Sequence, residues 1–135
     1  MKLAHPEKTV LGFTGDGASM YTIQALWTAA HYKVGAKFVI CNNQSYLLLK
    51  LNILQYWQER GIPEHEFPAS FDLGNPVIRF DTLAQGMGVP AVRVQTPDQV
   101  GPAIRKALEH DGPFLIDLVI TNDVPGSKIG CKCGQ

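Results

Sequence analysis

Two groups of polar residues follow apolar runs in the first third of the sequence. Gly15-Asp16-Gly17 follows the first run, and Asn42-Asn43 follows the second. Asp16 offers an anionic carboxylate oxygen and Asn43 a neutral amide oxygen, and Mg²⁺ prefers oxygen ligands of this kind. One carboxylate and one amide do not fill an octahedral shell, so water and phosphate oxygens would have to complete it.

A diphosphate could supply the missing oxygens. From Met20 onward the apolar residues recur at helical spacing, which predicts a helix. Unpaired backbone N–H groups and the dipole at its start would favour a phosphate, and Gly17 and Ala18 are small enough to let it approach. Without a cation Asp16 would repel the diphosphate, so an acid at this position makes sense chiefly as a metal ligand.

Each polar group also has a simpler interpretation as a turn. Asp-Gly is a common hairpin signal, and Asn-Asn is common in turns. The pattern after Gly17 is helical rather than alternating, which argues against a hairpin. Both groups also fall at the same edge of the sheet predicted below, which favours a site.

The apolar pattern alternates between short runs and helical spacing and predicts an α/β fold. Because all three connections between successive strands are helical, we expect a doubly wound parallel sheet with helices on both faces and ligands beyond the carboxyl ends of the strands. The expected strands are residues 9–14, 37–41, 91–94 and 114–120. One helix is expected to begin at Met20, and three more are expected at residues 47–59, 80–87 and 97–110.

The helix predicted at 47–59 is nearly apolar all round its first turns. We expect it to be plain core or to line a substrate pocket, and Leu47, Leu48 and Leu51 would promote association if they are exposed. The proline-rich segment 61–76 predicts a long loop. His31 near a helix end is expected to be a surface residue. His65 on that loop is expected to be solvated, with a place over an active site as the alternative.

Composition indicates one small globular domain without a nucleic-acid or membrane partner. The 135 residues include 12 basic and 12 acidic side chains, so the formal net charge is zero. No apolar run is long enough to cross a membrane and no signal peptide is evident, so we expect a cytoplasmic protein. Cys131 and Cys133 are expected to lie in a solvated tail rather than in a metal or redox site.

The spacing of the two polar groups resembles the cofactor signature of thiamine diphosphate enzymes: GDG, 24 intervening residues, then NN. The similarity extends through ALWTAAHY, NNQSY, FDLGNPVIRFDTLAQGMGV and GPFLIDLVI, and is strongest to the benzoylformate decarboxylase and acetolactate synthase branch. The resemblance implies that residues 1–121 form the diphosphate-binding domain of the thiamine diphosphate-binding fold. Residues 122–135 would form a Gly- and Cys-containing tail.

Carried over by position, the resemblance implies that Mg²⁺ is bound by the Asp16 carboxylate, the Asn43 side chain and the Ser45 backbone carbonyl. The metal would bridge the two phosphates of thiamine diphosphate. The cofactor-binding positions implied are Asp16, Gly17, Ala18, Asn43, Ser45 and Tyr46. This sequence departs from the family pattern at two positions. Many relatives have Ser in place of Ala18 and a small residue in place of Leu47.

The function implied is that of a cofactor-anchoring part of a 2-oxo acid decarboxylase or acetolactate synthase-like enzyme, a thiamine diphosphate-dependent lyase or transferase. In the family, the activating glutamate lies on a separate pyrimidine-binding domain or subunit. No catalytic residue is therefore assigned to this chain, and we expect it to be inactive alone. The resemblance begins inside the family's cofactor domain, so we expect an N-terminally truncated domain within a homo- or hetero-oligomer.

Two other functions stay open. A non-catalytic assembly module could keep the fold and pair with another chain; the late start of the resemblance and Ala18 permit this, whereas Asp16 and Asn43 argue against it. A nicotinamide or P-loop nucleotide domain is disfavoured, because GFTGDGASM is not G-x-G-x-x-G and G-x-x-x-x-G-K-[ST] does not occur. The sequence does not specify which 2-oxo acid is the substrate, or whether the enzyme is a decarboxylase or a synthase.

Overall fold

The chain folds into two units in a computed structural model that describes residues 1–123. Unit 1 comprises Met1–Asn42 and Arg79–Ile120, and unit 2 comprises Asn43–Ile78 and the residues after Ile120. From residue 124 on, the predicted tail with Cys131 and Cys133 lies outside the described residues. No helix within residues 1–123 combines the length and the apolar character needed to cross a membrane.

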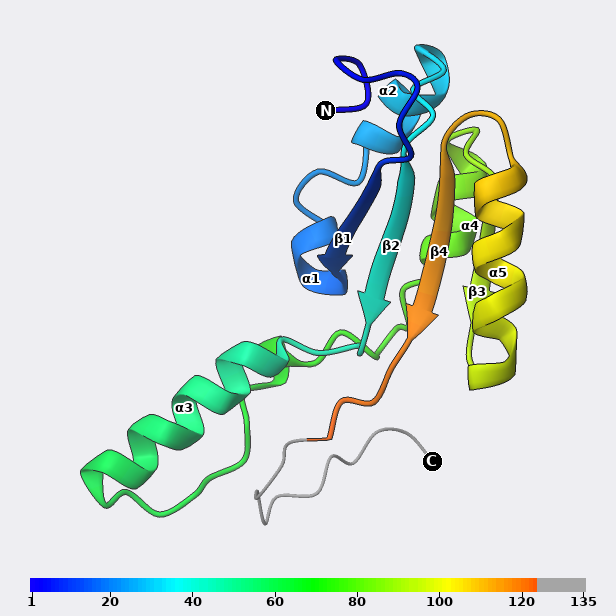
Figure 1. The fold of residues 1–135 in the computed structure, drawn as a ribbon. Coiled ribbons are helices and arrows are strands. Elements are labelled where there is room, and N and C mark those ends of the chain that lie inside the picture. Colours follow the sequence, from blue (N-terminus) through cyan, green and yellow to red (C-terminus); the bar gives the residue numbers. More distant parts are fainter. Residues whose placement is uncertain (124–135) are drawn as a thin grey trace. The chain divides into compact units, whose positions relative to one another are not determined.

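Unit 1 is built on a four-stranded sheet with the order β1-β2-β4-β3 (Figure 1). All three neighbouring pairs are parallel. The predicted parallel α/β sheet is therefore confirmed, and each strand lies close to its predicted range. The strands are β1 Leu11–Gly15, β2 Lys37–Asn42, β3 Ala91–Val94 and β4 Phe114–Val119.

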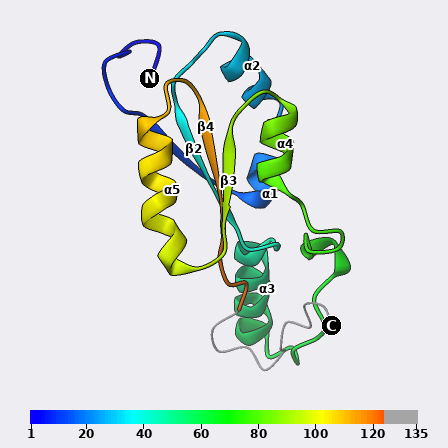
Figure 2. The ribbon, with the colours of Figure 1, turned by 90° about the vertical axis from the view of Figure 1, so that its right-hand side faces the viewer.

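Helices cover both faces of this sheet, as predicted (Figure 2). The path from β3 to β4 runs back across the sheet, so a right-handed crossover puts its helix α5 on the face opposite α4. Ala103 and Ala107 of α5 let the helix approach Val39, Val94 and Ile116 closely. The helices of unit 1 are α1 Asp16–Ser19, α2 Ala25–His31, α4 Phe80–Gly86 and α5 Pro97–Glu109.

The prediction that a helix begins at Met20 is wrong. Helix α1 makes one turn directly after β1, residues 20–24 form turns, and α2 begins at Ala25. The turn hydrogen bonds from Tyr21 N–H to the Ala18 carbonyl and from Thr22 N–H to the Ser19 carbonyl replace continuous α-helical bonding. Thr22 and Ile23 are β-branched neighbours, which lose side-chain freedom in a helix. A phosphate cannot therefore be placed at a helix beginning at Met20.

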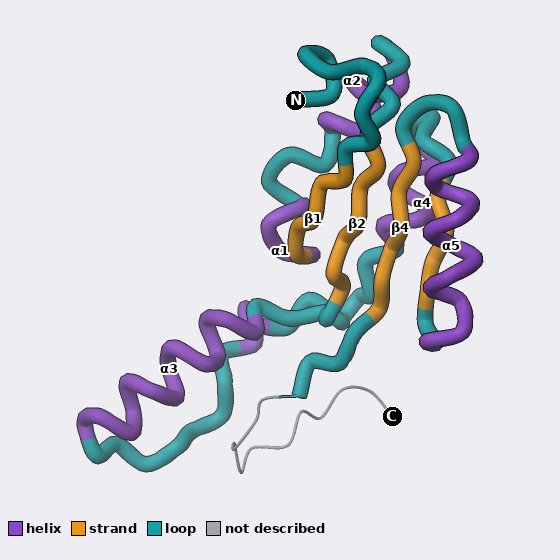
Figure 3. The backbone as a smooth tube through the Cα atoms, viewed as in Figure 1, coloured by secondary structure: helices purple, strands orange, loops and turns teal. Residues whose placement is uncertain are grey.

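Unit 2 contains helix α3, Leu47–Arg60, and the short 3₁₀ helix η1, Ala69–Phe71 (Figure 3). The predicted helix 47–59 and the long loop after it are confirmed. On the buried side of α3, the Trp57 and Phe67 rings stack with centroids 5.9 Å apart, and Lys50 Nζ lies 5.5 Å from the Phe67 centroid. Leu48 and Leu51 are exposed, as expected for an isolated chain, whereas Leu47 is half-buried.

Candidate functional site

Asp16 is the first residue after β1 and begins the single turn of α1. Its side chain is buried, and the Gly17 backbone N–H donates a 2.8 Å hydrogen bond to Asp16 Oδ1. The Ser19 hydroxyl donates to the Gly15 carbonyl at 2.7 Å, which ties the turn back to the end of the strand. The acidic side chain is thus fixed by its own turn at the carboxyl end of β1.

The two small residues expected near a diphosphate, Gly17 and Ala18, both lie in α1. Gly17 is buried and Ala18 is exposed. The first N–H groups of a helix have no backbone acceptor within the helix; in α1 that of Gly17 donates to Asp16 Oδ1, so a ligand would be served by the N–H groups after it. Because α1 has one turn, this local donor set matters more than a helix dipole.

Asn43, Ser45 and Tyr46 form the short connection between β2 and α3, within unit 2. The Ser45 backbone N–H donates a 3.0 Å hydrogen bond to Asn43 Oδ1, which makes a local turn of the kind that Asn favours. Gln44 between them has a φ of 57°. The amide oxygen of Asn43 is thereby oriented by the residue whose carbonyl is the next predicted ligand.

A segment far along the chain supports this connection. The Tyr46 N–H donates to the Phe71 carbonyl at 3.0 Å, and the Leu73 N–H donates to the Gln44 carbonyl at 2.8 Å. The Ser45 hydroxyl also donates to the Phe71 carbonyl, at 3.2 Å. Residues 43–46 are therefore held by backbone groups that the sequence analysis did not associate with the site.

Gly74 closes this supporting segment. Its N–H donates a 2.8 Å hydrogen bond to Asp72 Oδ1. A Cβ atom on Gly74 would come within 3.1 Å of both Asp72 Oδ1 and Gln44 Oε1. The sequence signal for this contact is the Asp-Leu-Gly turn in FDLGNP.

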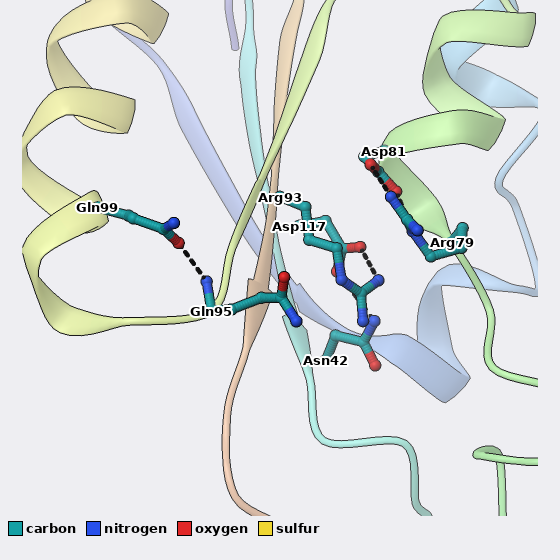
Figure 4. Close-up of polar contacts among 7 residues, drawn as sticks. All are labelled: Asn42, Arg79, Asp81, Arg93, Gln95, Gln99 and Asp117. Atoms are coloured by element: carbon teal, nitrogen blue, oxygen red, sulfur yellow. Dashed lines mark hydrogen bonds and ion pairs between the residues drawn. The ribbon is translucent and has the colours of Figure 1, made fainter.

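A buried polar network also lies in unit 1, and the sequence analysis missed it (Figure 4). Asn42 Nδ2 donates to Asp117 Oδ1 at 2.9 Å, and Arg93 Nη1 donates to Asp117 Oδ2 at 2.7 Å. Burial raises the pKa of Asp117, and the hydrogen bond from Asn42 and the charge of Arg93 act in the opposite direction. The available signal was a charged residue within each of the apolar runs FLIDLV and AVRV.

A second ion pair begins α4. Arg79 Nε and Nη2 donate to Asp81 Oδ1 and Oδ2 at 3.0 and 2.8 Å. These hydrogen bonds lower the pKa of Asp81 below its usual value of 3.8. The paired geometry fixes the chain at the point where it re-enters unit 1.

The structure places the predicted site residues in two local groups. Asp16, Gly17 and Ala18 share α1 in unit 1, whereas Asn43, Ser45 and Tyr46 share one connection in unit 2. Strands β1 and β2 are hydrogen-bonded neighbours, with Gly15 opposite Cys41. The chain therefore passes into Asp16 from one strand and, through Asn42, into Asn43 from the adjacent strand.

The donor chemistry of these residues fits Mg²⁺. A carboxylate, an amide oxygen and a backbone carbonyl are all hard oxygen donors, unlike the nitrogen and sulfur ligands typical of zinc. In residues 1–123 no group of three or more His, Cys, Asp or Glu side chains is placed to hold a metal. His65 is exposed, with its ring centroid 5.8 Å from that of Trp57, and His31 is exposed and stacks on Trp27.

Comparison with known proteins identifies the family. Residues 1–118 match the model described as thiamine pyrophosphate enzyme, C-terminal TPP binding domain. The chain belongs to the thiamine pyrophosphate enzyme family. Thiamine pyrophosphate, also called thiamine diphosphate, is the cofactor of this family, and Mg²⁺ is typical of it. The resemblance drawn from GDG and NN is thus confirmed.

Relatives come from both branches of the resemblance. The chain is 36% identical over 117 residues to benzoylformate decarboxylase of Pseudomonas aeruginosa, and this alignment covers 87% of the chain and 20% of the relative. It is 33% identical over 124 residues to chloroplastic acetolactate synthase 1 of Oryza sativa subsp. japonica, covering 87% and 18%.

A solved structure extends the likeness to the fold. The thiamine diphosphate-dependent 4-hydroxybenzoylformate decarboxylase of Rhodococcus jostii RHA1 has a TM-score of 0.77 and 35% identity to this member of the thiamine pyrophosphate enzyme family, and covers 90% of the chain. The chain spans about a fifth of the length of these relatives, between 18% and 21%.

Proposed function

We propose that this chain binds thiamine diphosphate through Mg²⁺ and anchors the cofactor diphosphate in a 2-oxo acid decarboxylase or acetolactate synthase-like enzyme. The observation that carries the proposal is the position of the two side-chain ligands in the chain: Asp16 directly follows β1, and Asn43 follows the end of the adjacent strand β2. In open α/β sheets, ligands bind beyond the carboxyl ends of the strands. The family match supports the choice of cofactor.

Each residue has a defined part in this proposal. The Asp16 carboxylate, the Asn43 amide oxygen and the Ser45 carbonyl would hold Mg²⁺, and the metal would offset the repulsion between the Asp16 carboxylate and the phosphates. Gly17, Ala18 and Tyr46 would contact the diphosphate. Thiamine diphosphate, when bound, supplies the electron sink for chemistry at a 2-oxo acid. The chain binds and orients the cofactor.

The complete activity would require parts outside this chain. The proposed partners are a pyrimidine-binding domain or subunit that contributes the activating glutamate, a 2-oxo acid substrate, and further copies in a homo- or hetero-oligomer. We therefore expect the isolated chain to bind cofactor without measurable turnover. The cytoplasmic location expected from the sequence stays a prediction.

Isothermal titration of the chain with thiamine diphosphate, with and without Mg²⁺, tests the proposal. We expect binding that depends on Mg²⁺ and that is lost in Asp16→Ala. The control is Asp111→Ala, which removes an exposed carboxylate at the turn before β4. A folded chain that does not bind thiamine diphosphate would favour the alternative, a non-catalytic assembly module.

A further inference from the structure

The buried network around Asp117 ties together the three points at which the chain enters or leaves unit 1. The chain leaves this unit after Asn42 and after Ile120, and returns at Arg79. Asn42 is bonded through its side chain to Asp117, and its carbonyl accepts the Ile120 N–H at 3.0 Å. The third point, Arg79, is held by its paired hydrogen bonds to Asp81, whose backbone N–H in turn donates to Asp117.

The network lies in the half of the sheet that contains the carboxyl ends of the strands. Asn42 is the last residue of β2, and Asp117 and Arg93 lie opposite each other in the register of β4 and β3. Figure 4 shows the three side chains converging from three adjacent strands. The end of β2 is therefore fixed by Asp117 of β4, which is itself held by Arg93 of β3.

Stability alone does not account for this arrangement. Asp117 is fully buried and stands opposite Ile40 in β2, between the apolar residues Ile116 and Leu118 of its own strand. Replacing a buried ion pair by apolar residues of similar size is often neutral or stabilising, because the charges must be desolvated. The raised pKa of Asp117 reflects that desolvation. Directional hydrogen bonds, unlike apolar contacts, also fix the orientation of the Asn42 side chain.

We propose that Asp117 is a positioning residue which, together with Arg93, fixes Asn42 and so directs the adjoining residue Asn43 toward the metal. The inference rests on the proposed function of the Asp16 and Asn43 side chains. Mg²⁺ requires near-ideal octahedral geometry at 2.0–2.1 Å, so a small rotation of the Asn42 backbone would displace a ligand one peptide bond away. Mutation of residues that orient metal ligands typically lowers metal affinity by about 10- to 100-fold.

Two variants separate positioning from stability. Asp117→Asn keeps the size of the side chain and removes its charge. The triple variant Asn42→Leu, Arg93→Met, Asp117→Leu replaces the whole network with apolar side chains, and we expect it to keep the unfolding midpoint of the wild type. The matched control is Asp111→Asn, which removes the charge of an exposed carboxylate in unit 1.

Three measurements are made on each variant: the urea unfolding midpoint, hydrogen exchange of the peptide that contains residues 43–46, and the affinity for thiamine diphosphate with Mg²⁺. In both network variants we expect hydrogen exchange at residues 43–46 to be faster than in the wild type, and cofactor affinity to fall by at least about tenfold. A purely structural role would change these two readouts only in proportion to the unfolding midpoint.

The outcomes for the inference and for the proposed function are distinct. Unchanged exchange at residues 43–46 in folded network variants overturns the positioning role, whether or not the cofactor binds. Absence of Mg²⁺-dependent binding by the wild type contradicts the proposed function, and the exchange data still decide the positioning role. If the triple variant does not fold, Asp117→Asn decides by the same criteria, because it preserves the packing volume.

Discussion

The Ser45 backbone N–H donates a 3.0 Å hydrogen bond to Asn43 Oδ1, so two of the three proposed metal ligands are joined directly to each other. An amide oxygen has two lone pairs and can accept a hydrogen bond while it also coordinates a metal. This bond restricts rotation of the Asn43 side chain. The ligand is therefore ordered by local structure, which reduces the entropy that metal binding must remove.

The side-chain oxygen of Asn43 should determine cofactor binding, whether it belongs to an amide or to a carboxylate. We expect Asn43→Ala to weaken Mg²⁺-dependent binding of thiamine diphosphate by at least about tenfold, and Asn43→Asp to retain it, because a carboxylate is also a suitable ligand. Titration calorimetry measures both. Asn52→Ala, at an exposed position of α3, is the control. Equal affinity of Asn43→Ala and wild type would refute the assignment of this ligand.

The support from residues 71–74 should be sensitive to one methyl group. In Gly74→Ala the new Cβ would lie 3.1 Å from Asp72 Oδ1 and from Gln44 Oε1, so we expect a loss of about 1–3 kcal/mol in the free energy of unfolding and weaker cofactor binding. Gly86→Ala in α4 is the control, because a Cβ atom there would meet nothing within 4 Å beyond its own chain neighbours and helix backbone. Similar unfolding midpoints for the two variants would contradict the crowding at Gly74.

Asp81 and Asp117, two of the buried carboxylates of unit 1, should have opposite effects on stability as the pH changes. The lowered pKa of Asp81 contributes stability that is present above 3.8 and lost as the pH falls below that value. The raised pKa of Asp117 contributes stability that is present below 3.8 and lost as the pH rises through the raised value.

Urea unfolding across the acidic range measures this difference. The free energy of unfolding of the wild type relative to Asp81→Asn should increase as the pH rises toward 3.8. The same quantity relative to Asp117→Asn should decrease as the pH rises above 3.8. Parallel pH profiles for the two comparisons would be inconsistent with the opposite directions of the two pKa shifts.

The core of unit 1 should depend on the centre of β4. Leu115 is fully buried, so we expect Leu115→Ala to lower the free energy of unfolding by about 2–5 kcal/mol. Ile104 on α5 is 43% exposed, and Ile104→Ala should cost clearly less. Urea denaturation of both variants checks the expectation, which fails if the costs are equal.

Exposed leucines on α3 should promote association of the isolated chain. Leu48 and Leu51 are 69% and 38% exposed, and burying such apolar surface between chains would be favourable. We expect light scattering to give a mass above the 14.8 kDa of one chain, and Leu48→Gln with Leu51→Gln to lower it. Gln58→Ala on the same helix is the control. A monomeric wild type would show that this surface does not associate.

The parts of the fold that could be predicted from sequence depend on local patterns. The four strands were predictable because each is a short apolar run bounded by a breaker, such as Gly35 before β2. The predicted helix start at Met20 was wrong because apolar spacing takes no account of the low helix propensity of the β-branched pair at residues 22–23. The family and its two polar groups were recognisable because GDG and NN have a fixed spacing.

The supporting contacts could not be predicted because they join distant residues. Asn42 and Asp117 are 75 positions apart, and nothing local marks either as a hydrogen-bond partner of the other. The Phe71 carbonyl that holds Ser45 and Tyr46 is a backbone group, which any residue type provides. Such contacts depend on topology rather than on residue type.

The dependence of residues 43–46 on backbone groups at 71–73 has a consequence for protein engineering. A chimera that exchanged residues 43–46 alone with those of a relative would place the new loop on a support shaped for the old one, because Gly74 is fitted against Gln44, which the exchange would remove. The smallest transferable module is therefore discontinuous. It consists of residues 43–46 together with residues 71–74, although more than twenty residues separate them in the sequence.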